Sequence, residues 1–293
     1  MTGKNKSPWN LRRANALELA ERLVSSTKTG LPTNLGEAAK RRLVQQIQFR
    51  PLLTDGGIAV LPDGFKIYVR CESGEADDLT SRFEEDGTGA SLPPKLVNRA
   101  RFTIAHEISH TFFYDISQSP PRLKVDLKTA RIVQSLEASC NRVAEELLLP
   151  RTFINQKCAT SDLTVPSHLS ALANTALVAK ETLILRFQRR ITVEHPYAII
   201  ASVSLQNGDW TITAISKHYA LDGLFPKAVS HAPLTALIEH PDFLPFGGEM
   251  ETVEMKVNWG SGTMKRMQFS CDFSTWKRSP SSTFVTVKPI DEL

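Results

Sequence analysis

The sequence predicts an α+β protein in which helices and a small sheet come first and a β-rich region comes last. Up to about residue 190, apolar residues recur mainly with helical spacing, interrupted by short β-rich runs between 47 and 69. From Pro196 onward the pattern changes to the alternation that is typical of strands. The chain has 293 residues, of which 41% are apolar, so it is long enough and apolar enough to form two domains with buried cores.

The first predicted elements are helices over 11–27 and 36–46, where Leu, Ala, Glu and Arg recur with helical spacing. Thr33 or Asn34 is placed to cap the second helix. Residues 1–50 carry ten Lys or Arg against three Glu, although the formal net charge of the chain is only +4. Such a segment can meet nucleic acid or an acidic partner, but most basic runs are solvated helix faces. The charge alone therefore selects no partner.

A small antiparallel sheet is the next predicted element. Short β-rich runs occupy 47–49, 58–60 and 65–69, and Pro62-Asp63-Gly64 suits a tight hairpin turn between the last two runs. Residues 71–94 are acidic and contain Gly, Ser and a Pro pair. This composition favours an exposed loop that leads into a helix.

Two longer helices are predicted after this loop. The first runs from about residue 96 or 98 to 113, because Ile104, Ile108 and Phe112 repeat every four residues. The second covers about 127–149 and ends before Pro150. The second helix is the natural packing partner of the first. Its expected buried stripe consists of Val133, Leu136, Cys140, Ala144 and Leu147.

Residues 166–190 look like two further helices, and the segment could be a helix-turn-helix with basic residues near its end. A recognition helix usually displays polar residues to base edges, whereas this one carries Leu183, Ile184, Leu185 and Phe187. These side chains favour a scaffold role, and the docking of a protein substrate is the next possibility.

The last part of the chain is predicted to be a β-rich domain. Strands at 199–205 and 210–215 flank an Asn207-Gly208 turn, and two alternating runs follow at 253–259 and 267–273. We expect a domain boundary near 191–196. The predicted division is therefore an N-terminal part over 1–150, a helical segment over 151–192 and a β-rich domain over 193–293, for which we expect a sensory or regulatory role.

The compartment is predicted to be the cytoplasm. The N-terminus has no apolar signal-like stretch, and no run approaches the roughly 20 apolar residues that cross a bilayer, so no membrane partner is expected. The cysteines are isolated in sequence, which favours reduced thiols over a disulfide framework or a thiolate zinc site. They are Cys71, Cys140, Cys158 and Cys271.

A His-Glu-x-x-His pattern lies on the first long helix and is the strongest chemical signal. His106 and His110 are four residues apart, so a helix places both imidazoles on one face, where they can reach one metal ion. Glu107 then lies beside the metal and is the candidate general base. The alternative is an amphipathic helix with two surface histidines.

A catalytic zinc ion needs a third protein ligand and keeps a fourth position for water. A further Gly and His after His110, as in metzincins, are absent here. Glu137 is the best candidate, because it lies in the middle of the second helix and is followed four residues later by Asn141. The Asn141 amide oxygen could accept the Nδ1 proton of His106, which leaves Nε2 for the metal. The alternative is a solvated surface glutamate.

These residues resemble a known family. The motif Arg101-Phe-Thr-x-Ala-His-Glu-x-x-His110, followed by Glu137-x-x-Cys140-Asn141-x-x-Ala144-x-Glu146-Leu-Leu-Leu-Pro150, is similar to the ImmA/IrrE family of bacterial metallopeptidases. The organisation is closest to the IrrE branch. The chain has Ser109 where many members have Gly, Cys140 where Ala is usual and Leu149 where Met is common. None of these differences removes a ligand.

The resemblance implies a gluzincin-like fold, one zinc ion per chain, and a limited cut in a helix-turn-helix transcriptional repressor that relieves repression after stress or a mobile-element signal. Zinc lowers the pKa of a bound water toward about 7 and polarises the scissile carbonyl, and Glu107 is the expected proton carrier. The ligand types also suit manganese or iron in the cell. Donors that could stabilise the oxyanion are Tyr114, His195, Tyr197 and His231.

A rival hypothesis from another class is a DNA-binding or protein-binding regulator that keeps a structural or vestigial metal site. Under this hypothesis Glu107→Gln leaves the regulatory effect intact, whereas a peptidase loses turnover. Direct DNA binding would also fall steeply with salt and depend on Arg186, Arg189 or Arg190.

Overall fold

A computed structural model describes residues 8–26, 30–127, 129–160, 166–179, 182–183, 186, 199–206, 209–215, 227–228, 250–259, 263–272, 277–279 and 282–292. The chain divides into two compact units, one formed by Met1–Ile154 with Ala173–Thr182 and the other by Asn155–Leu172 with Leu183–Leu293. The protein is of the α+β class, with helices and a small sheet in the first unit. The predicted domain boundaries at 150 and 192 stay predictions, and the region 191–196 lies outside the described residues.

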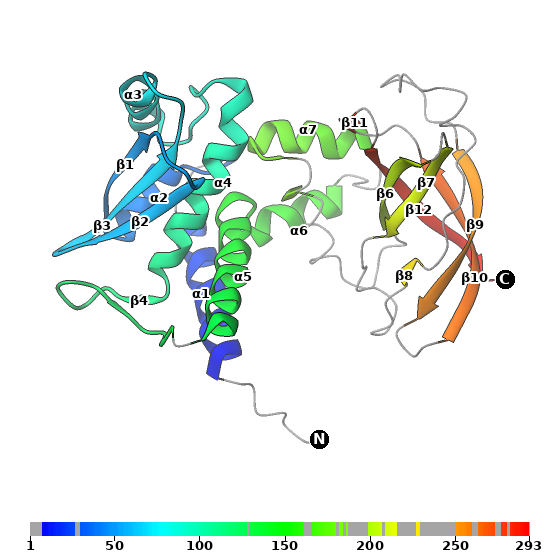
Figure 1. Cartoon of the computed structure of the whole chain (residues 1–293), viewed down its shortest axis with the longest axis horizontal. Helices are drawn as coiled ribbons and strands as arrows, with labels where there is room; N and C mark the ends of the chain where they lie inside the picture. Colours follow the sequence, from blue (N-terminus) through cyan, green and yellow to red (C-terminus); the bar gives the residue numbers. More distant parts are fainter. Residues whose placement is uncertain are drawn as a thin grey trace. The chain divides into compact units, whose positions relative to one another are not determined.

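The first unit contains a three-stranded sheet and the helices that surround it (Figure 1). Asn34 caps α2, as one of the two predicted alternatives, and its side chain accepts a hydrogen bond from the Glu37 N–H at 2.8 Å. The elements that lie wholly in this unit are α1 (Pro8–Ser26), α2 (Leu35–Arg41), β1 (Val44–Arg50), β2 (Gly56–Leu61), β3 (Gly64–Arg70), α3 (Ala76–Asp86), α4 (Pro94–Thr111), β4 (Tyr114–Asp115), β5 (Arg122–Leu123) and α5 (Ala130–Leu148).

The small sheet is mixed, which corrects the prediction of an antiparallel sheet. Its strand order is β1-β3-β2, so β2 and β3 form the expected antiparallel hairpin while β1 pairs with β3 in parallel. The reason is burial, because β3 carries the apolar side chains Phe65, Ile67 and Val69, all at most 1% exposed. The most apolar strand takes the centre, and β2 becomes an edge that is paired only on one side.

Residues 76–86 form helix α3, where the sequence was expected to give an exposed loop. Leu79 and Phe83 lie four residues apart and are both buried, which gives the helix an apolar stripe despite its acidic composition. Gly87 ends the helix in the left-handed conformation that glycine adopts without strain, with φ of 61°. The Asp86 carboxylate then accepts hydrogen bonds from the backbone of the next turn.

Helix α4 lies between the sheet and α5 (Figure 1). Pro94 stands in its first turn, where the missing N–H costs nothing. Ile104 and Ile108 are fully buried and form the core with Phe49 and Phe65 of the sheet. The burial of Ile104 and Ile108 fixes which side of α4 faces the core, and thus which of its side chains lie on the other sides.

The second long helix, α5, ends near the predicted position, and α1 packs against it. Thr129 caps its N-terminus by accepting a hydrogen bond from the Ile132 N–H. Four of the five residues of the predicted stripe are buried, but Val133 is 39% exposed. The stripe therefore starts one turn later than expected.

Helix α6 (Arg151–Thr160) follows directly after Pro150 and lies in the segment 151–192 that was predicted to be helical, and α7 (Pro166–Ala176) lies in the predicted helical pair. Most of residues 180–190, on which the second helix of that pair falls, lie outside the described residues. Among the helices that the structure describes, none has the length and apolar character needed to cross a membrane.

The second unit contains a seven-stranded sheet with the order β7-β6-β12-β10-β9-β8, in which β11 also pairs with β12. The four predicted strands correspond to β6 (Ile199–Gln206), β7 (Asp209–Ile215), β9 (Met250–Trp259) and β10 (Thr263–Asp272). The Asn207-Gly208 turn itself lies outside the described residues. Three of the strands that the structure describes in this unit were not predicted, namely β8 (Lys227–Ala228), β11 (Lys277–Ser279) and β12 (Ser282–Glu292).

Candidate metal centre

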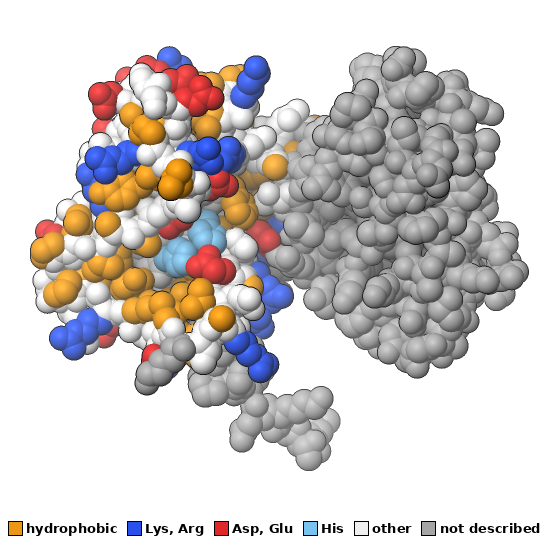
Figure 2. Space-filling model, in the orientation of Figure 1, with side chains coloured by type: hydrophobic (Ala, Val, Ile, Leu, Met, Phe, Trp, Pro, Cys, Tyr) orange, Lys and Arg blue, Asp and Glu red, His pale blue; other side chains and the backbone are white. Residues whose placement is uncertain are grey.

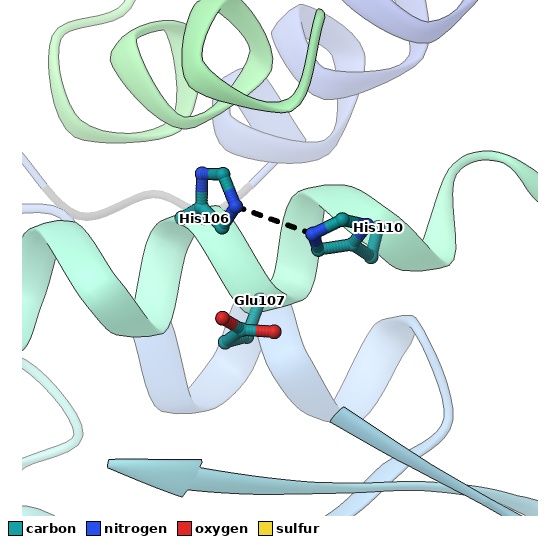
Figure 3. Close-up of side chains that lie close together, drawn as sticks. All are labelled: His106, Glu107 and His110. Carbon is teal, nitrogen blue, oxygen red and sulfur yellow. Dashed lines mark hydrogen bonds between the residues drawn. The ribbon is translucent and has the colours of Figure 1, made fainter. Parts of the chain in front are cut away.

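Helix α4 presents His106, Glu107 and His110 as one group. Each residue offers a potential ligand atom, and these atoms all lie within 4.8 Å of one another. The two imidazoles meet edge to face, and their Nε2 atoms are 3.2 Å apart. Figure 3 shows both rings on one side of α4 and the Glu107 carboxylate on another side, toward the strands. The group could hold a metal ion.

Helix α5 brings a carboxylate to the same place. The two oxygens of Glu137 lie 3.1 Å from Nε2 of His106 and 3.7 Å from Nε2 of His110. The side chain of Glu137 is 48% exposed, whereas the imidazoles are 17% and 15% exposed. The structure therefore brings together the four residues that the sequence singled out, and the side of the group next to Glu137 is open to solvent.

The Nδ1 atoms of both histidines also have partners on α5. Nδ1 of His106 lies 2.8 Å from Oδ1 of Asn141, which is the contact expected from the sequence. Nδ1 of His110 lies 3.5 Å from the sulfur of Cys140. Cys140 was predicted as a small core residue and is indeed fully buried, but its contact with His110 was missed. The spacing within α5 alone does not indicate this contact, because it depends on how α5 lies against α4.

Burial first, and neighbouring charges second, shift the pKa values of several groups in the site. Burial, and then the charge of Glu137, raises the pKa of Glu107 to about 7. Burial, and then the neighbouring His106, lowers the pKa of His110 to about 4, although Glu137 acts in the opposite direction. Burial also raises the pKa of the Cys140 thiol well above its usual range. Without a bound cation, His110 and Cys140 are thus neutral near pH 7.

The edge strand β2 approaches this group closely. A Cβ atom on Gly56 would lie 2.4 Å from Cγ2 of Thr103 and 3.1 Å from Oε1 of Glu107. Glycine therefore allows the backbone of β2 to pack against α4 beside the Glu107 carboxylate.

Large apolar side chains are exposed on two elements near the group. Val60 on β2 is 41% exposed, and Val133 on α5, one turn before Glu137, is 39% exposed. Figure 2 shows pale blue histidine surface with a red acidic side chain beside it and orange hydrophobic surface nearby. The face of the molecule that carries the site is therefore partly apolar.

Other residues that the sequence singled out are less well placed by the structure. Tyr114 on β4 is half-buried, its ring stands edge-on to Phe65 at 5.2 Å between centroids, and its pKa is raised by burial and then by Cys140. His195, Tyr197 and His231, the other candidates for oxyanion stabilisation, lie outside the described residues. Leu183 and Arg186 of the possible helix-turn-helix are 0% and 3% exposed.

Fold and site together define an α+β protein with a side-chain group that could hold a metal ion. No family model matches the sequence, and no characterised protein matches it closely enough to count as a relative. Among solved structures, a Mycobacterium tuberculosis transcriptional regulator is similar, with a TM-score of 0.45 and 12% sequence identity. The match covers 98% of this chain and 81% of the regulator. A similarity of this strength supports no statement about function.

Proposed function

We propose that this chain is a zinc-dependent endopeptidase in which His106, His110 and Glu137 bind the metal and Glu107 carries the proton. The observation on which the proposal rests is the spacing of the donor atoms. Two nitrogens bound tetrahedrally to zinc at about 2.0–2.1 Å lie about 3.3 Å apart. The Nε2 atoms of the two histidines are 3.2 Å apart, and Glu137 oxygens lie 3.1 and 3.7 Å from them.

The donor set fits a catalytic ion better than a structural one. Three protein ligands, two imidazoles and one carboxylate, leave the fourth position of a tetrahedral zinc ion for water. Because Glu137 is 48% exposed, that position faces solvent, where a substrate can enter. When bound there, zinc supplies Lewis-acid polarisation of a peptide carbonyl and activation of water.

Glu107 is placed to act as the general base. Its carboxylate lies within 4.8 Å of both imidazole donors, close enough for one water molecule to bridge the space between them. The side chain is only 7% exposed, and burial makes it a stronger base than a solvated carboxylate. It takes a proton from the attacking water and returns that proton to the departing amine.

An extended polypeptide is the substrate class that fits the surroundings. Strand β2 is an edge of the three-stranded sheet and lies beside Glu107, so a substrate segment can pair with its free side as an added strand. The exposed Val60 and Val133 offer apolar contacts to that segment. The resemblance to the ImmA/IrrE family narrows the substrate to a helix-turn-helix repressor, cut once in the cytoplasm to relieve repression.

The test compares the wild-type protein with Glu107→Gln, after measuring the metal content of both. The substrates are the helix-turn-helix proteins encoded beside the gene. We expect one equivalent of zinc in both proteins, and a single cut whose rate falls by about 10² to 10⁴ in the variant.

Glu84→Gln on α3, an exposed glutamate of another helix, is the matched control and should cut at the wild-type rate. A Glu107→Gln variant that cuts like the wild type would refute the assigned role of Glu107. A wild-type protein that binds no metal would refute the whole proposal.

A further inference from the structure

Helix α5 supplies a hydrogen-bond partner to each metal-site histidine, and only one of the two is a usual one. The amide oxygen of Asn141 lies 2.8 Å from Nδ1 of His106. The sulfur of Cys140, the preceding residue, lies 3.5 Å from Nδ1 of His110. Cys140 and Asn141, two consecutive residues of α5, thus face the Nδ1 atoms of His110 and His106, which lie one turn apart on α4.

We infer that Cys140 is a positioning residue whose sulfur accepts the Nδ1 proton of His110 and holds Nε2 of that ring toward the metal. The inference rests on the proposed metal site. A histidine that ligates through Nε2 carries its proton on Nδ1, and this proton needs an acceptor. In the part of the chain that the structure describes, the Cys140 sulfur is the group that lies within hydrogen-bond distance of this nitrogen.

Burial excludes water as a competing hydrogen-bond partner for the Cys140 thiol and for Nδ1 of His110. Cys140 is 0% exposed, and the imidazole of His110 is 15% exposed, so water reaches neither group freely. A buried N–H without an acceptor is unfavourable, because it gives up the hydrogen bond that water would otherwise provide. Sulfur is a weak acceptor, but it satisfies this donor without adding charge to the site.

Cys140 is not a metal ligand in this arrangement. Its sulfur approaches Nδ1 of His110, which is the nitrogen on the far side of the ring from the Nε2 atoms that face each other. The role of Cys140 is therefore parallel to that of Asn141. The two residues act through the histidines and touch no substrate.

The experiment measures zinc affinity by competition with a chelator of known affinity, using Cys140→Ala and Cys140→Ser. Loss of an orienting partner typically weakens metal affinity by about 10- to 100-fold, and a weak acceptor should lie near the lower limit. We expect Cys140→Ala to weaken zinc binding about 10-fold. Cys140→Ser keeps an acceptor of similar size and should recover most of the affinity.

The matched control is Ser139→Ala. Ser139 is also buried on α5, but its hydroxyl donates to the carbonyl of Ser135 at 2.7 Å and not to the metal site. This variant should bind zinc like the wild type. The absorption spectrum of the cobalt-substituted wild-type protein should lack the intense thiolate-to-cobalt band.

The results that would overturn the inference differ from one another, so each identifies which step of the inference fails. Equal zinc affinity in Cys140→Ala and Ser139→Ala would leave the proposed peptidase standing but remove the role of Cys140. Equal losses in Cys140→Ala and Cys140→Ser would mean that the acceptor is irrelevant. A thiolate-to-cobalt band would make Cys140 a ligand. If the wild-type protein binds no zinc, the proposed function fails and this role fails with it.

Discussion

The two polar regions of helix α4 are satisfied in opposite ways. Arg101, near its middle, is 0% exposed and donates hydrogen bonds to four backbone carbonyls, those of Thr33, Thr88, Ala176 and Leu177. Nearer the C-terminal end of the same helix, His106 and His110 are partly exposed and contact side chains of α5 instead.

This difference separates a polar group that maintains the fold from one that is available for chemistry. The carbonyls around Arg101 belong to three chain segments, so the guanidinium ties these segments together and cannot exchange its partners without unfolding them. The histidines contact side chains of α5, and their Nε2 atoms lie close to each other, to Glu137 and to Glu107. A metal ion bound there, as proposed, would replace these contacts with bonds to the same side chains.

The largest expected effect on folding is that of Arg101→Leu. The change leaves buried carbonyls without donors, so we expect the free energy of unfolding of the first unit to fall by about 3–5 kcal/mol. Urea-dependent hydrogen exchange in peptides from α4 measures this quantity. Arg99→Leu is the control, because Arg99 is exposed, forms an ion pair with Asp55, and should cost less than about 1 kcal/mol. Equal losses of stability in the two variants would mean that Arg101 does not hold the three chain segments together.

Gly56→Ala should have the next largest effect. Its Cβ would lie 2.4 Å from Cγ2 of Thr103, so β2 or α4 must shift, at a cost of about 1–3 kcal/mol. Gly57→Ala is the matched control, since no atom lies within 4 Å of its Cβ position, and we expect a change of less than about 0.5 kcal/mol. Urea-dependent hydrogen exchange in peptides from β2 measures both changes in stability. If both variants are equally stable, β2 does not pack against α4 as described.

Asp86→Ala should cost less, about 1–2 kcal/mol at pH 7. Burial acts to raise the pKa of Asp86, but hydrogen bonds from the backbone N–H groups of Ser91, Gly89 and Thr88 outweigh it, so the pKa is lowered from 3.8. The folded-state pKa lies below the unfolded one, so the stabilisation is fully present above about pH 3.8 and is lost as the pH falls through the folded-state value. Urea titrations at pH 7 and pH 3 should show the difference between variant and wild type shrinking in acid; a constant difference would contradict this.

The smallest effect on folding should be that of Glu137→Ala. The side chain is 48% exposed, so the metal-free variant should unfold within about 0.5 kcal/mol of the wild type. Its zinc affinity, measured by equilibrium dialysis, should nevertheless fall by at least about 100-fold if the carboxylate is a ligand. An unchanged affinity would remove Glu137 from the proposed ligand set.

The sequence predicted those features that depend on spacing within one element. His106 and His110 share a face because a helix repeats every 3.6 residues, and Asn141 follows Glu137 by the same reasoning. Contacts between the two helices were predicted only where a metal-ligand role implied them, as for Asn141 and His106. The contact of Cys140 with His110 requires the register of α5 against α4, and periodicity does not specify that register.

The same limit explains the errors in the first unit. The parallel pairing of β1 with β3 depends on which strand is buried most deeply, and this is set by the helices that cover the sheet. Helix α3 was missed because its acidic residues outnumber Leu79 and Phe83, the two side chains that anchor it.

Glu137, Cys140 and Asn141 lie within five consecutive positions of α5, a span of little more than one helical turn. If α5 slid along α4 by one turn, about 5.4 Å, the carboxylate and both acceptors would leave the histidines together. The centre is thus assembled or dismantled as a whole by a single helix-to-helix contact. Retention of the proposed metal ion would therefore depend on whether α5 is docked against α4.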